Sequence, residues 1–163
     1  MITMDAKKVI AIHDLVIELD RQIQPDDYLP GIHNMGELEA LFEWRIRPEN
    51  DVVTNAACVL DSITARHIFR NGNKRTGLAV AYIMLESEGY VFEATEKERL
   101  NFLLSIAKYE MTVEDIENWL RDNTHKMGTI RYKLNYMFKK TRFGILINLY
   151  KVLKICIPKQ NNK

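Results

Sequence analysis

Apolar residues recur at helical spacing through the first part of this chain. A helix is expected over residues 5–20. Its apolar face consists of Val9, Ile12, Val16 and Leu19. Prolines, a glycine and an asparagine in residues 23–34 predict a loop. The following stretch, GELEALFEWRI, predicts a short helix that Pro48 ends.

A second helical pattern covers residues 50–68. Its apolar face consists of Val53, Ala56, Ala57, Leu60, Ile63 and Thr64. Because that face continues to His67, we expect His67 on the inward side of the helix, at or near its C-terminal end. The next helix is predicted from Lys74 to Glu88, with Gly89 as the closing residue. It is apolar all round, which predicts the central, buried helix of the domain.

Beyond Gly89 the stretch YVFEA is short and predicted to be extended. Thr95 with Glu98, and Thr112 with Asp115, have the spacing of capping boxes. They predict helices over about 96–108 and 113–122. The pattern therefore indicates an all-α body with a single core. We divide the chain of 163 residues into this body, residues 1–125, and a C-terminal extension, residues 126–163.

Charge separates these two parts. The body carries 13 basic and 22 acidic residues, whereas the extension carries 10 basic residues and no acidic one. The apolar stretch of the extension, residues 143–157, is too short to span a bilayer. Three readings stay open for the extension: a helix packed on the acidic body, a basic helix at a membrane surface, or a nucleic-acid contact.

Composition and cysteine usage favour a cytoplasmic protein. A hydrophobic content of 47% and a charged content of 28% are typical of soluble globular domains. No signal peptide is visible at the N-terminus. Cys58 and Cys156 have no metal-ligand spacing around them and are expected to be reduced, packed thiols.

The stretch RHIFRNGNKR places a dense polar cluster at the entrance of the apolar helix. A helix N-terminus offers unpaired N–H groups and a partial positive charge to an anion. Gly72 allows a ligand to approach the backbone, and Lys74 and Arg75 add full charges. His67 can accept a proton near neutral pH. This pattern favours phosphoryl or nucleotidyl transfer; the alternative is that the polar residues only cap a buried helix.

The stretch HIFRNGNKRTG resembles the signature of the Fic/Doc family, His-x-Phe-x-acid-Gly-Asn-(Gly or Lys)-Arg. The similarity includes VIAIHD and PGIHNMGELEALF upstream and covers roughly residues 8–122. Lys74 and Leu78 resemble the Doc branch, the "death on curing" toxins. The resemblance implies the Fic fold, a compact helical bundle around a central buried helix with a short β-like flap.

The resemblance also implies a role for each matching position. His67 would be the general base. Gly72, Asn73, Lys74 and Arg75 would bind the phosphates; Phe69 and Arg66 would support the motif; Pro30, Gly31, Ile32 and His33 would form a flap that docks an extended target segment. Asn71 stands where the family has an acidic metal ligand. His13 and His125, like His33, are expected to be surface or packing residues rather than catalysts.

The cosubstrates implied by the resemblance are ATP and Mg²⁺. A Doc-like toxin would transfer the γ-phosphate of ATP to a protein hydroxyl, a threonine of elongation factor Tu, and so block translation. Its inhibitor would be a Phd-like antitoxin. Two alternatives remain: a Fic-type transfer of AMP, and a degenerate module that only binds nucleotide or a partner, which the neutral side chain of Asn71 favours.

Overall fold

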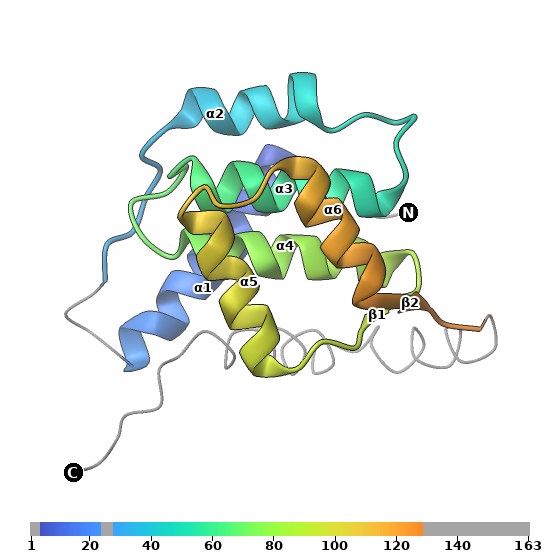
Figure 1. Ribbon diagram of the computed structural model, residues 1–163. Helices are drawn as coiled ribbons and strands as arrows, with labels where there is room; N and C mark the ends of the chain where they lie inside the picture. The colour runs from blue at the N-terminus through green and yellow to red at the C-terminus, as the bar shows by residue number, and fades with distance from the viewer. Residues whose placement is uncertain (1–3, 24–27, 129–163) are drawn as a thin grey trace, which may run out of the picture.

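A computed structural model describes residues 4–23 and 28–128 of the chain. These residues form helices and one small antiparallel sheet, which confirms the all-α expectation (Figure 1). The elements are α1 (Ala6–Ile23), α2 (Met35–Ala40), the π-helix η2 (Leu41–Arg45), α3 (Val52–Ala65), α4 (Asn73–Ser87), β1 (Tyr90–Phe92), α5 (Glu96–Ala107), α6 (Val113–Asp122) and β2 (Thr124–Lys126).

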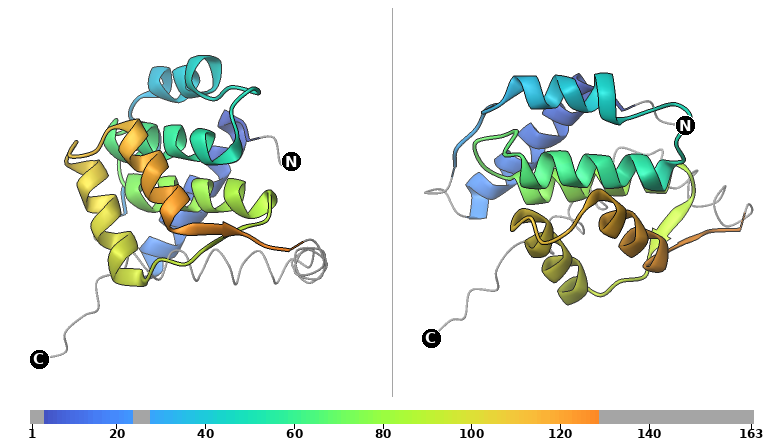
Figure 2. Two further views of the ribbon diagram at one scale, coloured as in Figure 1. Left: turned by 45° about the vertical axis from the view of Figure 1, so that its right-hand side comes forward. Right: turned by 45° about the horizontal axis from the view of Figure 1, so that its top comes forward.

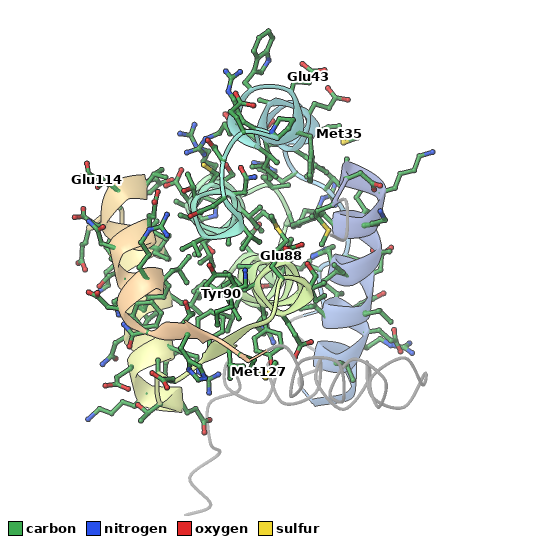
Figure 3. All side chains as sticks on the ribbon, turned by 90° about the vertical axis from the view of Figure 1, so that its right-hand side faces the viewer. Met35, Glu43, Glu88, Tyr90, Glu114 and Met127 are labelled. Atoms are coloured by element: carbon green, nitrogen blue, oxygen red, sulfur yellow. The ribbon has the colours of Figure 1, made fainter. Side chains whose placement is uncertain are left out.

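Helices α3 and α4 form the centre of the body. Figure 3 views this pair along the helix axes, with α1 on one side, α5 and α6 on the opposite side, and α2 above. Almost every residue of α3 is buried, and α4 buries the run from Thr76 to Ala81. The prediction of a central, buried helix is therefore confirmed for α4, and α3 shares that position.

A glycine allows the two central helices to approach each other closely. A Cβ added at Gly77 of α4 would lie 2.6 Å from the Thr64 Oγ1 atom of α3, which is too short for real atoms. Because α3 leads into the polar cluster and α4 leads out of it, this close packing fixes the two ends of the intervening loop relative to each other.

The predicted helix starts at Thr95 and Thr112 and the predicted helix end at Gly89 are confirmed. Thr95 and Glu98 form a complete capping box at the start of α5, and Thr112 and Asp115 form another at the start of α6. Gly89 follows the C-cap of α4 with a φ of +84°, the left-handed conformation that ends many helices. The stretch after it is extended, as expected, and forms β1.

Strand β2 was not predicted from the sequence. It pairs with β1 in antiparallel register, Tyr90 opposite Lys126 and Phe92 opposite Thr124. The Met127 N–H then donates to the Gly89 carbonyl at 2.7 Å. The body therefore continues slightly past residue 125, while the division into a body and an extension stays a prediction. Residues 129–163, with Cys156 and the apolar stretch, lie outside the described residues.

Two further observations concern the described part of the chain. None of its helices combines the length and apolar composition that crossing a bilayer requires. Cys58 is a free thiol buried in α3, and this burial raises the pKa of the Cys58 thiol. A raised pKa keeps the thiol protonated and unreactive, in agreement with the expected reduced, packed cysteine.

Candidate functional site

The polar cluster forms a loop between the two central helices, residues 66–72, which we call the motif loop. The prediction that His67 lies on the inward side of a helix is wrong. Helix α3 ends at Ala65, and His67 is exposed, with a left-handed φ of +50°. The carbonyl of Ala65 accepts a hydrogen bond from the hydroxyl of Tyr109 rather than from the next helical turn. The helix therefore stops before His67 can join its apolar face.

The flap, residues 28–34, runs along the motif loop (Figure 2). Ile32 forms an antiparallel bridge with Phe69, flanked by two hydrogen bonds: His33 N–H to the Ile68 carbonyl at 2.8 Å, and Arg70 N–H to the Gly31 carbonyl at 3.1 Å. Ile32 and Phe69 are therefore a non-hydrogen-bonded pair, in which the N–H and C=O groups of the two opposed residues point away from each other. One edge of the flap therefore bonds to the motif loop, and its other edge faces away from the loop.

Asn73, the first residue of α4, holds the opposite edge of the loop. Its side-chain oxygen accepts from the Phe69 N–H at 2.8 Å, and its amide group donates to the Phe69 carbonyl at 2.7 Å. The side chain therefore pairs with Phe69 much as a neighbouring strand would. Since both the oxygen and the amino group of this amide bond to Phe69, we expect a contact from Asn73 to phosphate to come from its backbone N–H, at the start of the helix.

Helix α1 supports the loop from inside. His13 is buried, and its ring stacks on Phe69 with 3.8 Å between the ring centroids and 9° between the planes. The His13 Nδ1 atom lies 3.2 Å from the Thr76 hydroxyl in the first turn of α4. Burial lowers the pKa of His13 to about 4, so the ring is neutral at physiological pH. His13 and Phe69 are both packing residues, as expected.

Gly72 brings the loop against the same helix. It has a φ of +72° and is the N-cap of α4. A Cβ at this position would lie 2.9 Å from the Ile17 Cδ1 atom of α1. The left-handed backbone therefore favours glycine here, and it allows α4 to begin directly after the motif loop, close to the movable end of the Ile17 side chain.

The N-terminus of α4 is the part of the site whose chemistry suits an anion. The first N–H groups of the helix have no helical carbonyl partner, and the helix dipole makes this end positive. Lys74 is exposed in this first turn, and Arg75 follows it, half-buried. Arg70 is also exposed on the preceding loop. Backbone and side chains therefore provide positive potential of the kind that recognises phosphate groups.

The residues present do not form a strong cation site. The side-chain oxygen of Asn71, the atom that a metal would need, accepts from the Gly72 N–H at 2.6 Å. A neutral amide also lacks the charge that makes carboxylates strong ligands for Mg²⁺. Among the described residues, no group of three or more His, Cys, Asp or Glu side chains is placed to hold a metal ion. The expected role of Asn71 as a ligand stays a prediction.

The remaining predicted residues lie around this core of the site. Arg66 makes ion pairs with Glu37 of α2 at 3.5 Å and with Asp61 of α3 at 3.6 Å, so it links these two helices. Pro30 and His33 are exposed on the flap. His125, on β2, lies away from the loop and pairs with Glu93 at 2.8 Å.

Sequence reasoning did not find the contacts that hold the loop in shape. The pairing of Asn73 with Phe69, the stacking of His13 on Phe69 and the hydroxyl of Tyr109 all join residues from different elements. Only the stretch VIAIHD, which places a histidine within an apolar helical face, gave a signal for one of them.

Comparison with known proteins shows a family match that includes the motif loop. A search of curated proteins gives no match. The model of the Fic/DOC family matches residues 3–85, which include α1, the flap, α3, the motif loop and nearly all of α4. That match covers half of the chain, including the motif loop itself, and the chain therefore belongs to the Fic/DOC family.

Proposed function

We propose that this protein transfers the terminal phosphate of ATP to a hydroxyl group of another protein, with His67 as the general base. Fic-family domains are generally transferases that act with a nucleotide. The observation that carries the proposal is the position of His67: its side chain is exposed on a loop fixed from three sides, directly before the positive N-terminus of α4.

The chemistry follows from this arrangement. Within the described residues the ring of His67 makes no hydrogen bond or ion pair, so it is available to accept a proton. A ring nitrogen would take the proton of the target hydroxyl while the hydroxyl oxygen bonds to the terminal phosphorus. The bond from phosphorus to the bridging oxygen breaks, and ADP leaves. The backbone N–H groups of α4, with Lys74 and Arg75, would hold the phosphates and stabilise their charge.

The flap supports a protein as the acceptor. The N–H and C=O of Ile32 face away from the motif loop and make no hydrogen bond within the described part of the chain. An extended segment could pair with this edge by strand addition. Leu29 and Met35, 55% and 44% exposed, flank the edge and offer apolar contacts to the side chains of such a segment.

Lys74 is the reason for placing phosphate transfer before AMP transfer. Where many family members have a glycine, this chain has a long cationic side chain, exposed in the first turn of α4. That side chain fills space beside the helix N-terminus and shifts the centre of the positive electrostatic potential there. The Doc-like motif extends the proposal to a toxin that acts on a threonine of elongation factor Tu and is inhibited by a Phd-like antitoxin.

A second candidate function is nucleotide binding without turnover. Asn71 favours it, because the oxygen of its side chain bonds to the loop itself and carries no charge for Mg²⁺. Under this alternative the phosphate-binding N-terminus of α4 would be retained, but the charge on the transferred group would be less well neutralised.

Labelled ATP tests these functions directly. Purified full-length protein is incubated with Mg²⁺, a target mixture that includes elongation factor Tu, and ATP labelled at either the γ or the α phosphate. Transfer of the γ label alone supports the proposal. Transfer of the α label replaces it with AMP addition. Failure of both labels to transfer, together with a rise in melting temperature on adding ATP, supports the binding module.

A further inference from the structure

The carbonyl of Ala65 is the last one of α3, and it lies two residues before His67 in the chain. In a continuing helix it would accept from the N–H of residue 69. Here the Phe69 N–H donates instead to the side chain of Asn73, at 2.8 Å. Ala65 is buried, so a carbonyl without a partner would be costly at this point. The hydroxyl of Tyr109 supplies that partner.

Tyr109 comes from a distant part of the sequence. It follows the C-cap of α5, in the connection to α6, which Figure 1 shows beside the end of α3 that leads into the motif loop. The family match ends at residue 85, so the motif and its matched neighbourhood do not include Tyr109. Tyr109 is 67% exposed as a residue, yet its hydroxyl reaches the last turn of α3.

The backbone conformation of Tyr109 is one in which glycine is the usual residue. Its φ is +59°, a left-handed conformation that is unfavourable for a residue with a side chain. The Tyr109 N–H bonds to the Ile106 carbonyl and the Glu110 N–H to the Ser105 carbonyl, the Schellman pattern in which glycine is the usual residue. Glycine would end α5 at lower cost, but it would leave the Ala65 carbonyl without the hydroxyl.

We propose that Tyr109 is a positioning residue for His67. Its hydroxyl fixes the last carbonyl of α3 and thereby the direction in which the chain turns into the left-handed conformation at His67. The catalytic part of this inference rests on the proposed function, in which His67 is the base. The structural part, that the hydroxyl of Tyr109 controls the orientation of the His67 ring, holds independently of any transfer activity.

Tyr109→Phe in the full-length protein tests the inference, because it removes the hydroxyl and keeps the ring. Tyr90→Phe is the matched control, since Tyr90 lies on β1, which Figure 1 shows at the end of α4 opposite to the motif loop. The measurements are the ring resonances of His67 by NMR and the kinetics of label transfer from ATP. We expect a shifted or broadened His67 signal only in Tyr109→Phe. We also expect kcat to fall about fivefold to tenfold with the KM for ATP unchanged, because the base is misplaced and the phosphate site is not.

Tyr109→Gly separates positioning from stability. It removes the hydroxyl but also relieves the left-handed backbone, so its melting temperature should fall less than that of Tyr109→Phe. Its His67 signal should nevertheless move as it does in Tyr109→Phe. A folded Tyr109→Phe protein with an unchanged His67 signal and unchanged kcat would overturn the inference. If the wild-type protein transfers no label, the proposed function fails, and the His67 signal alone decides whether Tyr109 positions the ring.

Discussion

The buried ring of His13 predicts a specific loss of stability in mild acid. Its folded-state pKa is about 4, against 6.5 for an ordinary histidine, because burial disfavours the charged ring. As pH falls below 6.5 the unfolded chain binds a proton that the folded chain does not bind. The contribution of His13 is therefore fully present above pH 6.5 and is lost progressively between pH 6.5 and 4. The difference between these two pKa values corresponds to about 3 kcal/mol.

Urea unfolding between pH 4 and 7.5 measures this effect when the wild type is compared with His13→Phe. Phenylalanine keeps a flat ring to stack on Phe69 but cannot bind a proton. Carboxylates with lowered pKa values, such as Asp51, act equally in both proteins and cancel in the difference. We expect the free energy of unfolding of the wild type to fall by about 2–3 kcal/mol more than that of His13→Phe over this range. Parallel curves, or a folded-state His13 that titrates near pH 6.5 by NMR, would refute the reasoning.

Three further predictions concern the motif loop. Gly72→Ala should lower the free energy of unfolding by about 1–3 kcal/mol in thermal or urea unfolding, since it puts a side chain on a left-handed backbone. Gly36→Ala in α2, whose Cβ would make only an ordinary contact, should change the free energy of unfolding little. Asn71→Asp should stabilise the N-terminus of α4 by about 0.3–1 kcal/mol without Mg²⁺, because a negative charge is favourable there. The same substitution should lower the Mg²⁺ concentration for half-maximal transfer, and unchanged metal dependence would remove Asn71 from the metal site. His67→Ala should reduce label transfer by about 10²–10⁴-fold at an unchanged melting temperature, and a collapse of helical circular dichroism would instead make His67 a structural residue.

Local signals in the sequence were sufficient for most of the fold. The capping boxes at Thr95 and Thr112 act within four residues, and Gly89 ends its helix through its own backbone. The apolar pattern of α4 likewise predicts its burial without knowledge of its neighbours. Such features depend on short-range chemistry, which the order of residues contains directly.

The error at His67 shows that local signals do not predict hydrogen bonds to distant residues. Apolar spacing alone continued the helix to His67, because nothing nearby in the sequence stops it. The competing hydrogen bonds come from the flap, from Asn73 and from Tyr109, up to 44 residues away along the chain. Strand β2 was missed for a similar reason: its three residues acquire a defined structure through pairing with β1.

These long-range contacts hold the motif loop in a conformation that its local sequence does not predict. The backbone of Phe69 is bound by Asn73, its ring is covered by His13, and its neighbours Ile68 and Arg70 are tied to the flap. His67 stands within this framework, and its ring makes no hydrogen bond or ion pair with residues 4–23 or 28–128, so its position depends on residues that do no chemistry themselves. Catalysis by a general base requires that a proton acceptor lie within hydrogen-bond reach of its target. For this protein, substitutions in α1, the flap or the α5–α6 connection should therefore change transfer rates through the placement of His67, without any change to the groups that bind phosphate.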